Sequence, residues 1–406
     1  MRDSLIYWIW LQRAVGPGSS VVARLLEAFP NAEAVWRTDR LTLEKAGVTD
    51  RRVLDALCRK ATDGAVKQAE RCARMGWMLT PEDLLYPEPL RHIFSPPLVL
   101  YGVGRLPDFE EGARPAIGIV GTRKSTTYGV QTAAAMAAGL AAVGCPIISG
   151  GARGIDRAAH EGALYANGYT VIVQACGLNV NYPLANRELR RDVLDGGGAI
   201  VTEFAPDTKA FPGNFPIRNR LISGMARAIC VVEAPAASGA LITARTAREQ
   251  GRDVFVIPGR ATDPQSDGSH ALIREGAALV TRPSQLLQEY PQQFSENEAT
   301  DADRGYAAYR EWVEGGARVV QKVADTPIAV PVATKPLGEP VPCPDYAGET
   351  ARKVYEILRN KEPLTADVIC DCSNLTPGEV FAALTELELY SCVENCPGKR
   401  YTIQTI

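Results

Sequence analysis

The sequence is short of histidine, of long hydrophobic runs and of any large excess of one charge. Its three histidines have no spacing typical of metal ligands or of a catalytic triad. No segment approaches the ~20 apolar residues that span a membrane, and the N-terminus lacks the small-residue cleavage site of a signal peptide. A net charge of −3 argues against a protein that coats nucleic acid with its whole surface, so a nucleic-acid site would be a local basic patch.

The ten cysteines form no paired framework of the kind that disulfides require. Together with the missing membrane segment, they indicate a cytoplasmic protein in a reducing compartment. Four of them gather near the C-terminus: Cys370, Cys372, Cys392 and Cys396. Their C-x-C and C-x₃-C spacings differ from the C-x₂-C pairs of zinc sites, so we expect free thiols and no metal, although the four could converge in the folded chain.

A chain of 406 residues should form two or three domains. Residues 1–80 are predicted to be all helical, with glycine turns at Gly16–Gly18 and Gly47, as in a helix-hairpin-helix or SAM-like domain. Such turns can present N–H groups to DNA phosphates or pack against a neighbouring domain, and we favour packing. Residues 81–115 are rich in proline and are predicted to be a connecting segment, in which residues 98–101 form an edge strand.

Apolar and helix-like segments alternate with regularity from residue 116 to residue 290. The predicted strands are 116–120, 146–149, 170–175, 199–204, 228–234 and 253–257. The predicted helices are 128–143, 154–167, 183–195, 216–226 and 238–250. This alternation predicts an α/β domain with a doubly wound, mostly parallel, Rossmann-like sheet. The loops that follow the strands should then share one edge of the sheet, where such folds bind ligands.

Two of these loops combine glycine with cationic residues. Gly121 follows the first predicted strand and precedes Arg123 and Lys124, whereas Gly151 follows the second and precedes Arg153. Glycine lets a ligand approach the main chain, and the N-terminus of the helix that comes next favours an anion. We therefore predict a phosphate site here rather than two ordinary turns.

Further cations and one aromatic side chain, Phe215, follow along the same edge. A ring among cations suits single-stranded nucleic acid, whose phosphates meet the cations while a base stacks on the ring. Phe215 could equally pack inward where its helix begins. Ser238 and Gly239 offer hydroxyl and N–H donors to a further phosphate. The cations along the edge are Arg123, Lys124, Arg153, Arg187, Lys209, Arg218, Arg220 and Arg260.

The last quarter of the chain changes character. Residues 291–345 are predicted to be a proline-rich linker, and residues 346–406 a winged-helix domain of three helices and a hairpin. The equivalent of its recognition helix, residues 377–389, carries three glutamates and neither Lys nor Arg. An acidic helix repels DNA, so we favour a protein partner for this domain over duplex DNA.

A set of motifs runs through the central region in a fixed order. They are Val120–Arg123, Ser149–Asp156, Ala159–Leu164, Tyr182–Pro183, Phe215–Ile222, Val232–Ala234, Ser238–Ala244, Gln250–Arg252 and Pro258–Gly259. In these motifs the chain resembles the DprA/Smf family of bacterial DNA-processing proteins across about residues 115–285. Gln174–Asn179 and Thr202 depart from the family pattern, but neither departure removes a cation.

The resemblance implies a non-enzymatic, cofactor-free protein that binds single-stranded DNA, acts as a homodimer through its Rossmann-like domain and loads the recombinase RecA during natural transformation. It maps Gly121, Arg123, Arg153, Lys209 and Phe215 to the DNA pocket. With the neighbouring loop residues, the predicted DNA-binding residues are Gly121, Thr122, Arg123, Lys124, Ser125, Gly151, Arg153, Lys209, Phe215, Arg218, Arg220, Ser238 and Gly239.

An enzyme of related fold stays open as the alternative. A nucleotide phosphoribohydrolase could use the same phosphate loops, with Glu203 or Glu233 as its acid–base group. Glu233 could instead pair with Arg220 or Arg252. His160 is expected to make a local hydrogen bond, since it lies one helical turn after Asp156.

Overall fold

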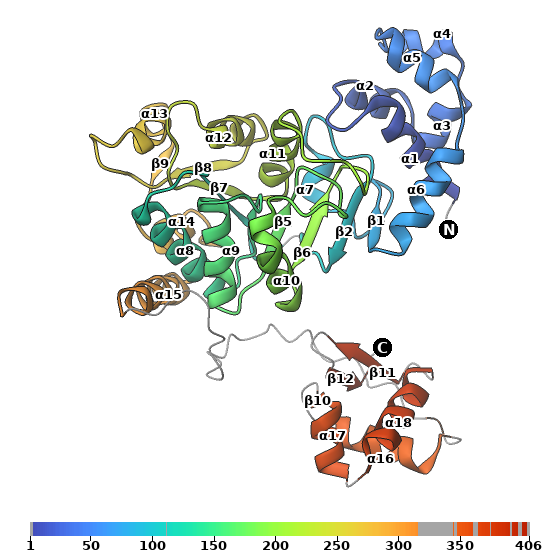
Figure 1. Ribbon diagram of the computed structural model, residues 1–406, viewed down its shortest axis with the longest axis vertical. Coiled ribbons are helices and arrows are strands. Elements are labelled where there is room, and N and C mark those ends of the chain that lie inside the picture. The colour runs from blue at the N-terminus through green and yellow to red at the C-terminus, as the bar shows by residue number, and fades with distance from the viewer. Residues whose placement is uncertain are drawn as a thin grey trace. The chain divides into compact units, whose positions relative to one another are not determined.

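The computed structural model describes residues 3–110, 112–315, 344, 347–359, 364–373, 375–389, 392–396 and 400–403. The chain forms two compact units, Met1–Thr326 and Pro327–Ile406, and each is described by itself (Figure 1). In the described part of the chain, no helix is both long enough and apolar enough to cross a membrane.

A nine-stranded, mostly parallel sheet is the centre of the first unit, with the order β1-β2-β6-β5-β4-β3-β7-β8-β9. Its strands are β1 (Trp77–Leu79), β2 (Leu100–Gly104), β3 (Ile117–Val120), β4 (Ile147–Ser149), β5 (Thr170–Val173), β6 (Ala199–Thr202), β7 (Ala228–Val231), β8 (Asp253–Val256) and β9 (Ala278–Leu279). β3 pairs in parallel with β4 on one side and with β7 on the other, so the winding direction reverses there. The predicted doubly wound, Rossmann-like sheet is confirmed, and each of its six predicted strands is present.

Helices cover both faces of this sheet (Figure 1). One face carries α8 (Thr127–Ala142), α9 (Ile155–Tyr165) and α10 (Arg187–Asp195), and the other carries α11 (Asn214–Met225), α12 (Gly239–Glu249) and α13 (Asp267–Arg274). α8 consists mostly of small and apolar residues, and it is buried continuously from Thr132 to Ala141. A Cβ on Gly162 would lie 2.0 Å from the carbonyl oxygen of Ala134, so glycine is required where α9 crosses α8.

The connecting segment contributes more to the sheet than the sequence indicated. Residues 98–101 were expected to form an edge strand, but β2 lies inside the sheet and pairs with both β1 and β6. The edge is β1, which lies within the segment that was predicted to be all helical. A strand of three residues is too short to show a periodic pattern, which explains the error.

Six helices precede the sheet and share a core with it. They are α1 (Asp3–Val15), α2 (Val21–Ala28), α3 (Ala32–Arg37), α4 (Arg40–Lys45), α5 (Arg51–Cys58) and α6 (Asp63–Ala73); a further short helix, α7 (Glu88–Arg91), packs on α11. At the Gly47 turn, the N–H groups of Gly47 and Val48 already donate to Glu44 and Leu43, and Asp50 caps α5. The structure therefore favours packing over phosphate binding at this hairpin.

The prediction that residues 291–345 form a linker is wrong for the first part of this range. After α14 (Pro283–Leu287), residues 296–314 form α15 (Glu296–Glu314), which begins with a Ser295–Glu298 capping box. Its Ala302 and Tyr309 are buried against the α8 face of the sheet. The Asp and Glu residues that suggested a linker lie mainly on the exposed face of an amphipathic helix, whereas Ala299 and Ala302 lie on its buried face. The proline-rich remainder, residues 316–343, lies outside the described residues.

The second unit confirms the winged-helix prediction. It contains α16 (Glu349–Leu358), α17 (Ala366–Ser373) and α18 (Pro377–Leu389), with a small sheet in the order β10-β12-β11. Its strands are β10 (Leu364–Thr365), β11 (Val393–Cys396) and β12 (Arg400–Ile403). Among the described residues no group of His, Cys, Asp or Glu could hold a metal, and the side chain of Cys396 lies outside them.

Candidate nucleic-acid site

Arg123 and Phe215 lie together at the edge of the sheet formed by the carboxyl ends of the strands. The Arg123 guanidinium carbon is 4.2 Å from the centroid of the Phe215 ring, a close cation–π contact. Arg123 comes from the loop between β3 and α8, and Phe215 from the first turn of α11. The ring therefore faces a cation at the rim, rather than packing only inward as the alternative interpretation held.

The two glycine loops lie against each other. Ile155 N donates to the Thr122 carbonyl oxygen (3.3 Å), and a Cβ on Gly154 would lie 2.4 Å from that same oxygen. A Cβ on Gly121 would lie 2.5 Å from the Ile155 side chain, so glycine is required there as well. This close approach brings Arg123, of the first loop, and Arg153, of the second, to the same part of the edge.

The cations of these loops are available to a ligand. Arg123, Lys124 and Arg153 are exposed, and within the part of the chain that the structure describes none of them forms an ion pair. Lys209 is exposed on the loop between β6 and α11, and its carbonyl oxygen accepts a hydrogen bond from Asn214 (3.3 Å). We call Arg123, Lys124, Arg153, Lys209 and Phe215 the Arg123–Phe215 cluster.

Arg218 lies underneath this cluster and is buried. Its Nη1 donates to the carbonyl oxygen of Val173 (2.6 Å), and its guanidinium carbon is 5.8 Å from the Phe215 ring centroid. Burial lowers the pKa of Arg218 to about 10, and the nearby Asp156 carboxylate opposes that shift. Arg218 was predicted to contact DNA; the structure instead makes it a buried charge that supports Phe215 and the Gly150–Gly151 turn.

Arg220 does not belong to the cluster. Its guanidinium donates to the buried carboxylate of Glu203 and to the carbonyl oxygen of Ser95. Glu203 also accepts a hydrogen bond from Gly18 N (3.3 Å). Two residues along a helix correspond to a rotation of about 200°, so Arg218 and Arg220 point to opposite sides of α11. Arg220 thus fastens the N-terminal helices to α11.

The remaining predicted residues have structural roles beside the cluster. The Ser238 hydroxyl caps α12 by accepting from Ala240 N (3.2 Å), and the Gly239 carbonyl oxygen accepts from Asn219 on α11 (3.4 Å). The Gly151 carbonyl oxygen accepts from Asn186 (2.9 Å). Ser125 comes just before the residue that caps α8, and the Thr122 hydroxyl accepts a hydrogen bond from Lys124 N (3.2 Å).

Two exposed aromatic residues were not predicted as site residues. The Tyr182 ring centroid is 5.8 Å from that of Phe215, and the Tyr182 side chain is 43% exposed. Phe211, which is 66% exposed, lies on the same loop as Lys209. The sequence could have pointed to both residues. Tyr182 precedes Pro183 and Phe211 precedes Pro212, and both lie on loops that were already predicted to lie at this edge of the sheet.

The two carboxylates that an enzyme would need are occupied. Glu233 is 1% exposed and accepts hydrogen bonds from the N (2.9 Å) and the hydroxyl of Thr126, the N-cap residue of α8, so it holds that cap in place and pairs with neither Arg220 nor Arg252. Burial raises the pKa of Glu203, and the Arg220 guanidinium opposes that shift. Neither group is accessible for acid–base chemistry at the phosphate loops.

His160 is buried, and its partner is on the sheet rather than on its own helix. Its Nδ1 lies 2.7 Å from the Thr170 hydroxyl oxygen, which donates its own proton to the carbonyl oxygen of Ile147. Burial, helped by the charge of Arg218, lowers the pKa of His160 to about 3. His160 is therefore a neutral core residue that packs α9 onto β5.

The buried neutral His160 should make stability depend on pH. Its folded-state pKa lies below the unfolded value of about 6.5, so on acidification the unfolded state binds the proton first. We expect the free energy of unfolding to fall by about 1.4 kcal/mol per pH unit below about pH 6 from this group alone. Urea titrations of the wild type and His160→Gln from pH 7 to pH 5 would show a shallower slope in the variant; equal slopes would contradict it.

Comparisons with known proteins agree with this fold. The family model "DNA recombination-mediator protein A" matches residues 77–291, and the model "DprA winged helix domain" matches residues 339–399. Protein Smf of Synechocystis is 34% identical over 97% of this chain and 98% of its own length. The DNA processing protein DprA of Streptococcus pneumoniae is 40% identical over 51% of this chain and 72% of its own length.

A solved structure gives the same result. The X-ray structure of DprA from Streptococcus pneumoniae superposes with a TM-score of 0.60 at 31% identity, and the match covers 70% of this chain and 97% of that one. The family model covers more than half of this chain, and the Synechocystis relative matches nearly all of it. The chain therefore belongs to the DNA recombination-mediator protein A (DprA/Smf) family and is a DNA-processing protein of that family.

Proposed function

We propose that the protein binds single-stranded DNA at the Arg123–Phe215 cluster and acts as a recombination mediator. The observation that carries the proposal is the Arg123 guanidinium 4.2 Å from the Phe215 ring, beside two glycine loops whose other cations, Lys124 and Arg153, are exposed and form no ion pair with any described residue. Cations neutralise phosphates, and the half-buried Phe215 ring among them offers a face on which a base can stack.

The proposed binding would be largely independent of base sequence. Stacking on Phe215 uses the π-face that every base has, and the cations of the cluster recognise the backbone. A duplex keeps its bases stacked inside the helix, so Phe215 could not engage them. Affinity should therefore be higher for single strands and should fall steeply with salt.

We further propose that the protein hands the bound strand to RecA and that it acts as a homodimer. Both proposals rest on the family resemblance, and we propose the cytoplasm as the location. For the dimer, support comes from the end of the sheet at β9, where Leu279 is 50% exposed and Ile242 of α12 is 44% exposed. A hollow of about 680 Å³ between α12, α13 and β9 adjoins Leu279.

The first experiment compares single-stranded with duplex DNA on the full chain. Fluorescence anisotropy of labelled poly-dT should give tighter binding than a duplex of equal length, with log affinity falling against log salt at a slope of about −0.7 for each phosphate that the protein neutralises. A RecA filament-assembly assay on the same strand should then show faster nucleation with the protein present. Equal affinity for both DNA forms would count against the proposal, and saturable binding of mononucleotides with turnover would favour the hydrolase alternative.

A further inference from the structure

A second cationic groove lies where the N-terminal helices meet the loop between β6 and α11. The groove has a volume of about 550 Å³ and is lined by α1, α6 and residues 205–208. Three cations line it: Arg13 of α1 and Lys67 and Arg71 of α6. All three side chains are exposed, and none was assigned to DNA by the sequence.

Arg13 is held in place by a buried chain of hydrogen bonds. Its Nη1 donates to the Gln68 side-chain oxygen (2.8 Å), and the Gln68 amide donates to the Tyr101 hydroxyl (2.7 Å). That hydroxyl donates to the side-chain oxygen of Gln12 (2.8 Å), whose amide bonds the main chain of residues 99 and 203. A guanidinium fixed in this way loses little conformational entropy when it binds an anion.

The charges of the groove do not cancel. Asp207 is the acidic residue in its lining, and Arg71 Nη2 donates to its Oδ1 (2.8 Å). Asp207 also accepts from Asn179 (2.9 Å), so the carboxylate is already shared. Within the described ranges neither Lys67 nor Arg13 forms an ion pair, and Arg13 donates to the neutral amide of Gln68. The groove therefore keeps a positive potential that attracts phosphates.

One loop joins this groove to the Arg123–Phe215 cluster. Thr208 lines the groove and Lys209, the next residue, belongs to the cluster. The loop is fixed because Gly177 N donates to the Thr208 carbonyl oxygen (2.8 Å) and Asn214, the neighbour of Phe215, donates to Ala175 (3.1 Å) and to Lys209. A strand that leaves the cluster past Lys209 would reach the groove directly.

We infer that this groove binds the phosphate backbone of the same single strand, beyond the Arg123–Phe215 cluster. The inference rests on the proposed function and extends it to the N-terminal helices. No aromatic side chain lines the groove, so it would hold phosphates without stacking bases. Because Lys209 joins the groove to the Arg123–Phe215 cluster, we favour a nucleic-acid strand over an acidic protein segment as the ligand of the groove.

Oligonucleotide length separates the two sites in a binding experiment. Lys67→Glu in the full chain should leave the affinity for a dT oligonucleotide of about six nucleotides within twofold of wild type, because that length fits the cluster alone. The same variant should bind a strand of about twenty nucleotides roughly fivefold to twentyfold more weakly, with a shallower salt dependence. Because Lys67 is exposed, the thermal unfolding temperature of the Lys67→Glu variant should match that of the wild type.

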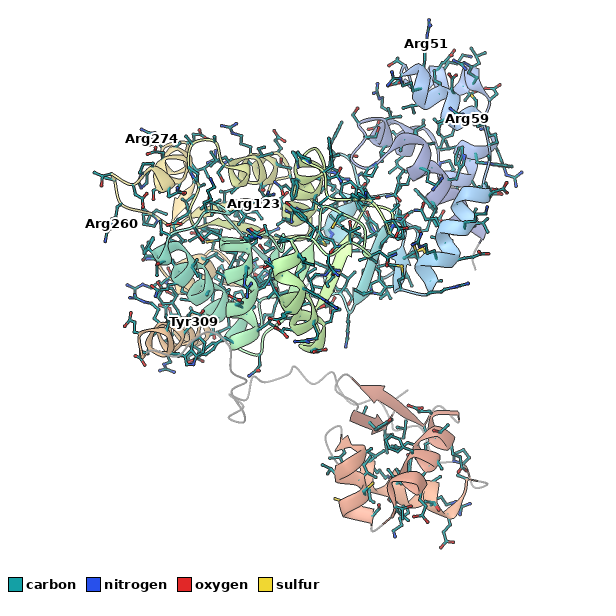
Figure 2. The ribbon with its side chains drawn as sticks, viewed as in Figure 1. Arg51, Arg59, Arg123, Arg260, Arg274 and Tyr309 are labelled. Carbon is teal, nitrogen blue, oxygen red and sulfur yellow. The ribbon has the colours of Figure 1, made fainter. Side chains whose placement is uncertain are left out.

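Arg51→Glu is the matched control, with the same change of charge on the exposed outer end of α5 (Figure 2). Equal affinities of Lys67→Glu and Arg51→Glu for the long strand would overturn the inference, as would an equal loss on short and long strands. A loss for duplex DNA alone, or unchanged DNA binding with loss of binding to a poly-Glu peptide, would overturn it too. If the wild type bound no single strand of either length, the proposed function itself would fail.

Discussion

Arg123→Ala is expected to weaken binding of a poly-dT oligonucleotide by about 1–3 kcal/mol, which is roughly a fivefold to hundredfold rise in Kd. The substitution removes an exposed cation that makes no ion pair in the described part of the chain, and it removes the group that lies over the Phe215 ring. The slope of log affinity against log salt should become less steep by about 0.7 for each phosphate that the variant no longer neutralises. Fluorescence anisotropy at two salt concentrations measures both effects.

Arg123→Lys and Arg51→Ala are the matched controls for this prediction. Lysine keeps the charge but not the planar group that stacks on an aromatic face, so its affinity should lie between those of wild type and Arg123→Ala. Arg51 is an exposed cation on α5, away from both DNA sites proposed above, and its removal should change the affinity less than twofold. If Arg123→Ala bound poly-dT as tightly as Arg51→Ala, the cluster would not be the DNA site.

Glu203→Ala is expected to lower the free energy of unfolding of the first unit by about 3–5 kcal/mol. Glu203 is 3% exposed and pairs with Arg220, whose side chain is 12% exposed. Removing the carboxylate leaves a buried guanidinium with no opposite charge. The free-energy cost of that unpaired charge exceeds the net stabilisation that the ion pair provided. The Gly18 N–H loses its acceptor as well, so the N-terminal helices should detach from α11 more readily.

Urea denaturation measures the loss, and limited proteolysis should cut the Glu203→Ala variant near the turn at residues 16–18. Glu27→Ala, which removes an exposed glutamate from α2, is the control and should change the free energy of unfolding by less than about 0.5 kcal/mol. A double-mutant cycle with Arg220→Ala isolates the pair, because the second substitution should cost much less once Glu203 is absent. Additive losses would show that the two groups do not interact.

The strands and the glycine loops of the central domain could be predicted because their signals are local. Each strand from β3 to β8 lies in a short, mostly apolar run that ends within three residues of a glycine, proline or polar residue, and such runs are typical of a parallel sheet covered on both faces. The loop cations follow from the same argument, since parallel strands place their carboxyl ends at one edge. Arg123, Lys124, Arg153 and Lys209 are exposed at that edge.

The errors have equally physical causes. α15 looked like a linker because its exposed face is acidic and rich in small residues, and only the contact of Ala302 and Tyr309 with the α8 face explains its folding. Arg218 and Arg220 looked like two further edge cations, because a sequence does not show that one arginine is buried beneath Phe215 and the other pairs with Glu203. Burial and pairing depend on residues far away in the chain.

The sequence by itself determined the class of fold, the position of the two glycine loops and the family, since all three depend on motifs within short segments. The tertiary structure decided which of these charged groups are exposed and which are buried with partners. Arg218 and Arg220 are buried and bonded to groups of other elements, and Glu233 is bonded to Thr126, whereas Arg123 and Lys67 are exposed and form no ion pair within the described residues. The physical reason is that the ability of a charged side chain to bind a ligand depends on its burial and on the charges around it. Folding brings those neighbouring charges from distant parts of the chain.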